Sequence, residues 1–479
     1  MRARVEWSTE EERARIADAA FGLLESVGMQ FGEGDALDAV AAAGARLDRE
    51  RGVARLPREL VEEALRGCPR DVVLGGSTPD HDCLLTEGAP HFTNSGSPPE
   101  TLDMETGRRR RRTTEDLRHA AVVLDAMPST SIAWAICTAT DVTEDRRTLG
   151  ELETLLTWTT MHVQHEIEGR WQIEPFMRMT EAAGGDVRLR PRTSVVCCTA
   201  SPLHAHSQLL DASTDLAALG IPVVVLPMPI AGATAPITAA GVATMNVAEF
   251  LGAATAIQLR APGAPLVMGI GPGLLDMRET TYCFGALEAG LAAAVCTEVA
   301  HHLGVPCLAP AMASDAKYPG IQAAYEKALK GLTVASALPD LMTGGIGVLQ
   351  GAGLMSLPQI VIDDEIAQMI LRILGGVEVS DATIMAEAME RVGHAGNFLV
   401  ERETRRRLRA GELFFPSIAD RQSYEHWEAH GRGELEKAAA RVRELVGAAE
   451  SRGPVLDEVA RATLAACVDE AADAAPKSG

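Results

Sequence analysis

The sequence predicts an α/β fold, a (β/α)8 barrel with helices and β-hairpins before it and helices after it. Short apolar runs alternate with longer amphipathic stretches between about residues 113 and 375. Each run is almost continuously apolar, as in parallel strands that are buried on both faces. Eight such units over about 260 residues match the size of a (β/α)8 barrel. A doubly wound sheet is the alternative, but it seldom needs eight evenly spaced strands.

Residues 1–112 are predicted to form helices and β-hairpins that pack on the barrel, because no Gly/Ser-rich or Pro-rich linker follows them. The segment Ser8-Thr9-Glu10-Glu11 has the form of a capping box, and apolar residues at helical spacing follow it as far as Gly28. Gly- and Pro-punctuated pieces from Val72 to Leu102 indicate hairpins.

The barrel is predicted to occupy residues 113–375, and residues 376–479 form a helical C-terminal region. The predicted strands are Ile132–Thr140, His162–Ile167, Ser194–Ser201, Pro222–Met228, Pro265–Ile270, Val305–Met312, Leu341–Ile346 and Ile360–Asp363. The clearest helical stretches are Ser207–Leu219, Ala239–Leu259, Thr281–Leu303, Ile321–Ala337, Glu434–Ala449 and Leu456–Ala474.

Composition excludes several classes of partner. The 479 residues include 44 Lys and Arg against 66 Asp and Glu, a net charge of −22. Such a surface repels phosphate backbones and anionic lipid, so we expect neither nucleic acid nor membrane as a partner. The charged N-terminus lacks the apolar core of a signal peptide, and nine cysteines show no framework spacing. We therefore expect a cytoplasmic protein with reduced thiols.

In a (β/α)8 barrel the chemistry lies where the strands end. The side chains and glycines expected at this mouth are Thr138, Thr140, His165, Glu166, Thr199, Ser201, Pro227, Pro229, Gly269, Gly271, Ser314, Asp315, Gly344 to Gly347 and Asp363 to Glu365.

Common cofactor motifs give weak signals. The segment Gly269–Gly273 resembles a dinucleotide loop, but Pro272 has no N–H to offer a phosphate. His204-x-His206, and His301-His302 with Cys307, do not supply three metal ligands at local spacing. We therefore expect no protein-bound metal.

One stretch is distinctive enough to indicate a family. Residues 227–238 read PMPIAGATAPIT, and Asn246-x-x-Glu249 follows on a predicted helix. Here the chain resembles the trimethylamine:corrinoid methyltransferase family. Further matches, in the same order, are Leu24 to Gly28, Leu102 to Gly107, Thr114-x-Asp116, and Ser314 to Lys317 with Gln322 and Glu326.

The resemblance implies a barrel enzyme that moves a methyl group from an amine to the cobalt of a corrinoid (cobalamin). The chain lacks the Asp-x-His-x-x-Gly motif of a corrinoid carrier, so a separate small corrinoid protein must supply the cobalt in trans. The loop residues expected to face this partner are Pro229, Gly232, Ala233, Thr234 and Pro236. We assign the catalytic carboxylates to Asp315 and Glu249, and we expect a homo-oligomer.

Two departures from the family pattern bear on the substrate. The trimethylamine-specific members carry pyrrolysine in a region equivalent to Thr343–Gly347, where this chain has only standard residues. It therefore resembles the branch without pyrrolysine, whose members use quaternary amines such as glycine betaine. A quaternary ammonium needs no electrophilic cofactor residue, since it leaves as a neutral amine. The second departure is Glu403-Thr404, where the family has a His-Thr pair.

Recognition of a quaternary ammonium usually needs aromatic faces, sometimes with a carboxylate. The residues assigned to substrate binding are Trp134, His165, Glu166, Tyr282, Phe284, Lys317, Gly344, Gly345 and Gly347. Lys317 is the donor for a betaine carboxylate. The three glycines are expected to leave the cavity open, because they have no side chain to fill it.

Two other functions fit parts of the sequence. A barrel lyase or isomerase acting on a phosphorylated substrate would use Gly344-Gly345-x-Gly347 as the phosphate loop after strand seven. A non-catalytic amine-binding protein or corrinoid-protein scaffold would keep the fold without methyl transfer.

Overall fold

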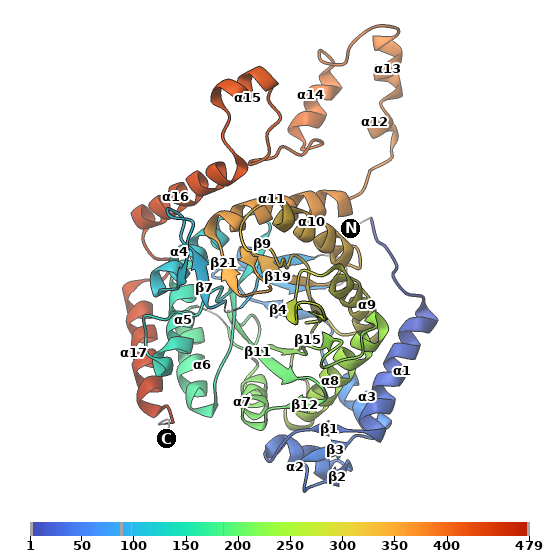
Figure 1. Ribbon diagram of the computed structural model, residues 1–479, viewed down its shortest axis with the longest axis vertical. Helices are drawn as coiled ribbons and strands as arrows, with labels where there is room; N and C mark the ends of the chain where they lie inside the picture. Colours follow the sequence, from blue (N-terminus) through green and yellow to red (C-terminus); the bar gives the residue numbers. More distant parts are fainter. Residues whose placement is uncertain (1–2, 87–89, 97, 185, 477–479) are drawn as a thin grey trace.

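The computed structural model describes residues 3–86, 90–96, 98–184 and 186–476. A closed barrel of eight parallel strands lies at its centre (Figure 1). Each strand pairs with the next around the ring, and the pairing of β19 with β6 closes it. In ring order the strands are β6 (His91–Asn94), β9 (Thr130–Trp134), β10 (His162–His165), β11 (Thr193–Ala200), β13 (Val223–Leu226), β15 (Leu266–Gly269), β18 (Cys307–Pro310) and β19 (Leu341–Ile346).

One long helix follows each barrel strand and packs on the outside of the ring. These helices are α4 (Thr114–Asp125), α5 (Glu144–Trp158), α6 (Ile173–Ala182), α7 (Ser207–Ala218), α8 (Ala239–Arg260), α9 (Leu287–Leu303), α10 (Ile321–Ala335) and α11 (Leu357–Leu374). The predicted fold class is therefore confirmed.

One predicted barrel strand is wrong and one barrel strand was missed, so the number of strands is still eight. The first barrel strand is β6, which the sequence had placed among the hairpins, so the barrel begins well before residue 113. The predicted eighth strand, Ile360–Asp363, lies inside α11. Its apolar run belongs to an amphipathic helix whose first turn contains Pro358, a favoured place for proline.

The N-terminal segment packs against the barrel helices α8 and α9. Its elements are α1 (Glu10–Ser26), β1 (Met29–Gln30), α2 (Asp35–Ala42), β2 (Arg46–Asp48), β3 (Val53–Arg55), α3 (Arg58–Arg66), β4 (Val72–Leu74) and β5 (Cys83–Leu85). The capping box of α1 lies one residue later than predicted, on Thr9 and Glu12. Ser8 instead donates to Glu298 on α9 (2.5 Å), which ties α1 to the barrel wall.

The loops at the carboxyl ends of the strands form two small sheets. The three-stranded sheet joins β14 (Ile230–Ala231), β16 (Gly273–Asp276) and β17 (Thr281–Cys283). The four-stranded sheet joins β20 (Val348–Leu349), β21 (Leu354–Met355), β7 (Glu100–Leu102) and β8 (Arg109–Arg111). A short strand, β12 (His204–Ala205), turns back against the end of β11.

The C-terminal region divides into packed helices and a projecting arm. Helices α16 (Glu434–Arg452) and α17 (Glu458–Ala474) pack on α4, α5, α6 and α11. The arm, residues 376–433, carries α12 (Asp381–Ile384), α13 (Ala386–Val392), α14 (Arg402–Arg409) and α15 (Tyr424–His430). Figure 1 shows this orange and red segment standing away from the barrel.

Among the described residues, α8 alone is long and apolar enough to cross a bilayer. Its most apolar window is 78% buried within the fold, where α1, α3 and α9 pack around it. This is the burial of a core helix.

Candidate functional site

The mouth of the barrel is the end at which the βα loops gather, and two groups of polar side chains lie there on opposite sides. One group follows β15, β18 and β19, and the other lies on β9 and β10. In the ring order β15 stands four strands from β9, and β18 stands four strands from β10. The two groups therefore face each other across the mouth.

On the first side, Asp315 is fixed against the aromatic segment that ends the three-stranded sheet. Its carboxylate accepts the N–H groups of Phe284 (2.9 Å) and Gly285 (3.0 Å). Burial raises the pKa of Asp315, and the neighbouring Glu326 acts in the same direction. The rings of Tyr282 and Phe284 stack with centroids 5.8 Å apart. The structure thus brings together three of the predicted residues: a carboxylate and two aromatic rings.

The two rings differ in accessibility. Tyr282 is 39% exposed, whereas Phe284 is 9% exposed. The Lys330 ammonium lies 4.6 Å from the centroid of the Phe284 ring and donates to the Phe284 carbonyl. The Phe284 ring therefore already has a cation–π contact with the Lys330 ammonium, and Tyr282 is the ring that a substrate can reach.

Lys330 and its neighbour Lys327 are buried charges that the sequence analysis missed. Lys327 donates to the carbonyls of Met312 (3.1 Å) and Gly345 (2.5 Å) and to the Asp363 carboxylate (2.8 Å). Burial lowers the pKa of both lysines, that of Lys330 to about 7. Lys327 and Lys330 are three residues apart, so the sequence places both on one face of the helix. Their burial was not predicted, because an amphipathic helix usually turns lysines toward solvent.

The predicted glycine loop is closely packed, so the expectation of an open cavity there is wrong. A Cβ on Gly345 would lie 2.2 Å from the Met312 backbone, and one on Gly347 would lie 2.5 Å from Ile360. A Cβ on Gly344 would meet Pro310 at 2.9 Å and the Phe284 ring at 3.1 Å. The glycines allow strand β19 and its loop to approach their neighbours.

On the opposite side, β10 turns alternate residues into the barrel. His162 is bonded to Ser194 on β11 (2.8 Å), and Gln164 is in register with both Ser194 and Trp134. Because side chains alternate along a strand, Gln164 and Trp134 face the same interior. Gln164 is 0% exposed.

These interior groups lack hydrogen-bond partners. Within the described chain, neither the Oε1 nor the Nε2 atom of Gln164 has one, and the Nε1 of Trp134 has none either. A buried polar group without a partner is costly, so such groups in a native fold call for an explanation. The sequence analysis assigned the neighbours His165 and Glu166 to the site but not Gln164. The signal that could have found Gln164 is the alternation of side chains along the strand, which puts it on the same face as His162.

His165 is on the wrong face of the strand for the predicted substrate contact. Its Nε2 donates to the Thr148 carbonyl on α5 (2.7 Å) and lies 3.7 Å from Glu151, also on α5. Burial lowers the pKa of His165 to about 4 and raises that of Glu151 to about 8. Glu166, just beyond the strand, is half-buried, and its pKa is raised by burial.

Glu249 lies on α8, where its carboxylate meets the end of β11 outside the barrel interior. Its carboxylate accepts Thr199 (2.6 Å), Ser201 (3.0 Å) and the N–H of Leu203 (3.0 Å). Burial raises its pKa. The carboxylate therefore fixes the end of β11 and the turn after it, and its catalytic role stays a prediction.

The remaining predicted residues lie on the mouth loops. Lys317 is exposed, and its Nζ donates to the Asp315 carbonyl (2.6 Å). In the loop after β13, Thr234 accepts the N–H of Ile230 (2.9 Å). Pro229 is buried, Gly232 and Thr234 are half-buried, and Ala233 and Pro236 are exposed.

This rim is apolar as well as exposed. Met228 and Ile237 of the same loop are exposed, as are Met277 and Tyr318 of neighbouring loops. A Cβ on Gly232 would lie 2.6 Å from Met277, so the loops after β13 and β15 meet at this point.

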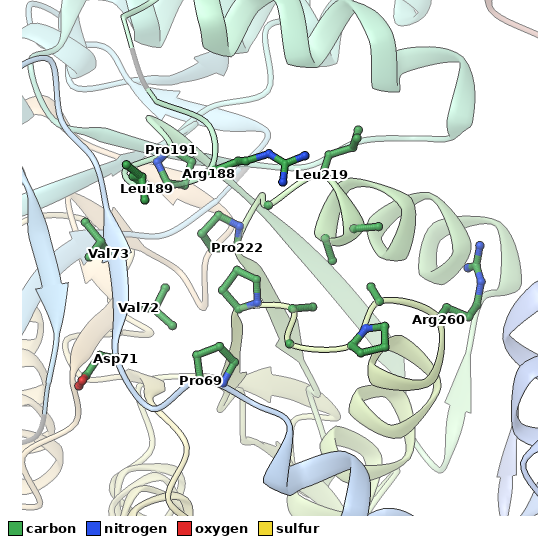
Figure 2. A pocket seen from close by; sticks show the side chains of 18 residues that line it. Pro69, Asp71, Val72, Val73, Arg188, Leu189, Pro191, Leu219, Pro222 and Arg260 are labelled. Atoms are coloured by element: carbon green, nitrogen blue, oxygen red, sulfur yellow. The ribbon is translucent and has the colours of Figure 1, made fainter.

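Two other features lie away from the mouth. A pocket of about 540 Å³ opens at the amino-terminal ends of β11, β13 and β15, where Figure 2 shows Pro191, Pro222 and Arg260 around it. His301, Cys307 and Asp340 gather near the starts of β18 and β19 with candidate ligand atoms within 4.8 Å of one another. Asp340 there accepts the N–H of Cys307 (2.8 Å).

Comparison with known proteins places the chain in context. The family model described as trimethylamine methyltransferase matches residues 2–476. The trimethylamine methyltransferase of Desulfitobacterium hafniense (strain DSM 10664 / DCB-2) is 30% identical over 469 residues, covering 97% of this chain and 94% of the relative. The glycine betaine methyltransferase of D. hafniense (strain Y51) is 24% identical, with 96% of each chain covered.

Among solved structures, the monomethylamine methyltransferase of Methanosarcina barkeri gives a TM-score of 0.47 at 12% identity and covers 91% of this chain and 93% of that one.

Proposed function

We propose a substrate and a partner for this protein from the premise that the chain belongs to the trimethylamine methyltransferase family. The substrate is a quaternary amine that carries a carboxylate, such as glycine betaine, and the methyl acceptor is a corrinoid held by a separate small protein. A relative of similar length is named glycine betaine methyltransferase.

The observation that carries the proposal is the pair of unpartnered donors inside the mouth. Trp134 Nε1 can only donate, and the Gln164 amide offers two further N–H groups. A carboxylate has two oxygens that accept hydrogen bonds, so it matches these donors, whereas trimethylamine has no group to satisfy them. Such hydrogen bonds are stronger in the barrel interior than at the surface, because water does not compete for them there.

The opposite side of the mouth suits the ammonium end. Tyr282 offers an accessible ring face, and the Asp315 carboxylate, from the loop after β18, is bonded to the same segment at Phe284. A cation is attracted to both, by the ring quadrupole and by the negative charge. A betaine lying across the mouth would therefore place its carboxylate at β9 and β10 and its methyl groups near the loops after β15 and β18.

The chain's own contribution is positioning. A quaternary nitrogen already carries the charge that makes its methyl carbon electrophilic, and the amine leaves neutral, so no side chain has to protonate it. Fixing both ends of the substrate orients one N–methyl bond toward the solvent side of the mouth. Orientation of this kind removes much of the entropic barrier to a two-partner reaction.

The apolar rim fits a corrinoid partner. Met228, Ile237 and Met277 form an exposed edge on the loops after β13 and β15, suited to a flat macrocycle and the protein around it. When bound, the corrinoid supplies a reduced cobalt nucleophile. The residues that would hold it in place are those of the rim, together with Ala233 and Pro236. We place the reaction in the cytoplasm, as expected for an acidic chain with free thiols.

The test compares substrates that differ only in the features named above. Purified protein with a reduced corrinoid protein is given glycine betaine, tetramethylammonium or trimethylamine, and the demethylated amine is measured by mass spectrometry. We expect turnover of glycine betaine, at least tenfold weaker turnover of tetramethylammonium, and none of trimethylamine. Turnover of trimethylamine with both quaternary amines inert would refute the proposal.

A further inference from the structure

Three side chains of different chemistry meet at the base of the barrel, the end opposite the mouth. His301 lies in the last turn of α9, Cys307 begins β18, and Asp340 directly precedes β19. Their candidate ligand atoms, one from each residue, all lie within 4.8 Å of one another. Asp340 is 33 residues away from Cys307 in the chain, so a search for metal ligands at local spacing does not find it.

The fold encloses this cluster and holds it in place. Cys307 is 0% exposed, Asp340 is 2% exposed, and the His301 side chain is 10% exposed. The Oδ2 atom of Asp340 accepts the N–H of Cys307 (2.8 Å), and the same carboxylate interacts with the Cys307 thiol. The next histidine, His302, lies outside the cluster, with its Nδ1 atom 4.0 Å from Glu10 on α1. The backbone bond therefore fixes the carboxylate beside the thiol at the start of β18.

The two acidic members of the cluster have little positive charge beside them. Among the residues that the structure describes, His301 is the only basic side chain within 4.0 Å of the Asp340 carboxylate, with Nε2 3.9 Å from Oδ2. This distance is longer than a hydrogen bond of about 2.7–3.2 Å. It is close to the separation of about 3.3–3.8 Å between two ligands of one tetrahedral zinc ion. Burial raises the pKa of Asp340 and that of the Cys307 thiol, because a buried anion needs a cation to compensate it.

The chemistry of the three donors selects the ion. A thiolate sulfur, an imidazole nitrogen and a carboxylate oxygen are the ligands that zinc takes in proteins, whereas Ca²⁺ and Mg²⁺ prefer oxygen alone. The thiolate and the carboxylate together carry two negative charges, so a divalent cation with a neutral imidazole gives a site without net charge, as burial requires. When the sulfur–zinc bond forms, the thiol proton leaves to solvent. Three protein ligands leave the fourth position of the tetrahedron to a water molecule.

We propose that His301, Cys307 and Asp340 bind one zinc ion, which joins the end of α9 to the starts of β18 and β19. The carboxyl ends of the same two strands lead to Asp315 and to the loop at 344–347, so the ion lies at the far end of the barrel from the mouth. In (β/α)8 barrels the mouth carries the chemistry, whereas the base serves stability. The ion is therefore structural and takes no part in methyl transfer.

Three single variants of the full-length protein test the site. Cys307→Ser removes the sulfur at nearly constant size, and Asp340→Asn removes the charge while it keeps an oxygen for the N–H of Cys307. Cys296→Ser is the matched control, because Cys296 is an equally buried thiol on α9 whose pKa is raised by burial alone. Each protein is produced with zinc in the medium and desalted, and its zinc content is measured by mass spectrometry and its zinc affinity by competition with a chelator. Circular dichroism establishes that each variant is folded.

We expect the wild type and Cys296→Ser to retain zinc in proportion to the protein, and the other two variants to bind it at least about tenfold more weakly. Co²⁺ in place of zinc should give a thiolate-to-cobalt charge-transfer band in the wild type, and Cys307→Ser should lack this band.

A wild type that retains no zinc and shows no such band would overturn the proposal and leave a metal-free contact between His301 and Asp340. Unchanged zinc affinity in Cys307→Ser or in Asp340→Asn would overturn this ligand set. These outcomes depend neither on the amine that the protein demethylates nor on the corrinoid partner.

Discussion

Two pairs of buried polar residues on opposite sides of the barrel mouth, Lys327 with Asp363 and Trp134 with Gln164, differ in how far their polar groups are paired. Beside β18 and β19, the Lys327 ammonium and the Asp363 carboxylate are bonded to each other and to neighbouring backbone groups. Beside β9 and β10, Trp134 Nε1 and both polar atoms of Gln164 are buried without a partner among the residues that the structure describes. A satisfied network stabilises the fold, whereas unsatisfied donors cost stability until a ligand bonds to them. From this contrast we infer that Lys327 and Asp363 stabilise the structure of the mouth, whereas Trp134 and Gln164 bind the substrate.

The largest expected effect is on the satisfied side. Asp363→Ala removes the only carboxylate bonded to Lys327 among the described residues and leaves a buried charge. We expect a loss of about 3–5 kcal/mol in the free energy of unfolding, measured by urea denaturation. The double variant Lys327→Met/Asp363→Leu should be clearly more stable than Asp363→Ala, because it removes both charges. If the two were equally unstable, packing rather than the ion pair would explain the loss.

The opposite side should respond in the opposite sense. Gln164→Leu removes two unpaired polar atoms at nearly constant volume, so the free energy of unfolding should be unchanged or higher. Affinity for glycine betaine should fall about tenfold or more, which corresponds to about 1.4 kcal/mol, by isothermal titration calorimetry. Gln208→Leu, on the exposed surface of α7, is the matched control and should change neither quantity. Unchanged affinity in Gln164→Leu would remove the carboxylate site from the proposal.

A smaller effect on the satisfied side depends on pH. Burial holds the pKa of Lys330 at about 7, below its ordinary value of 10.5. Between these values the unfolded chain binds more protons than the folded one, so Lys330 makes folding more stable as pH rises. The slope is at most about 1.4 kcal/mol per pH unit. In urea denaturation at pH 8 and 9, the rise in the free energy of unfolding with pH should therefore be smaller for Lys330→Met than for the wild type.

The comparison with Lys330→Met isolates the lysine from the other groups that titrate nearby. Glu151, with a pKa of about 8, changes charge in this range in the folded protein, whereas the Cys68 thiol, whose pKa burial raises to about 11, does so only when the chain is unfolded. These groups are present in both proteins, so their contributions cancel in the difference between the two free energies of unfolding. A difference between wild type and variant that stays constant from pH 8 to 9 would contradict a lowered pKa for Lys330.

The sequence predicted the barrel well because strand burial and helix periodicity are local patterns. It failed at β6, whose four residues include polar side chains, and at Ile360–Asp363, where a short apolar run does not distinguish strand from helix. At the site, Asp315, Tyr282 and Phe284 were found by residue type and do lie together. His165 was misplaced because one residue of register turns a side chain to the other face of the wall. Glu249 was misplaced because its helix, α8, turns the carboxylate toward the end of β11.

The last prediction separates the two aromatic rings that the sequence treated alike. Tyr282 is accessible, whereas the Lys330 ammonium already lies at the Phe284 ring. Tyr282→Leu should therefore weaken binding of glycine betaine about threefold to thirtyfold, equivalent to about 0.5–2 kcal/mol, while Tyr282→Phe keeps the ring and most of the affinity. Phe284→Leu should act mainly on the urea midpoint, because it removes a ring packed between Lys330 and Gly344. Calorimetry on the three variants distinguishes these roles. If Phe284→Leu lost affinity at an unchanged midpoint while Tyr282→Leu bound normally, the substrate would lie against Phe284, and Lys330 would have to move aside to admit it.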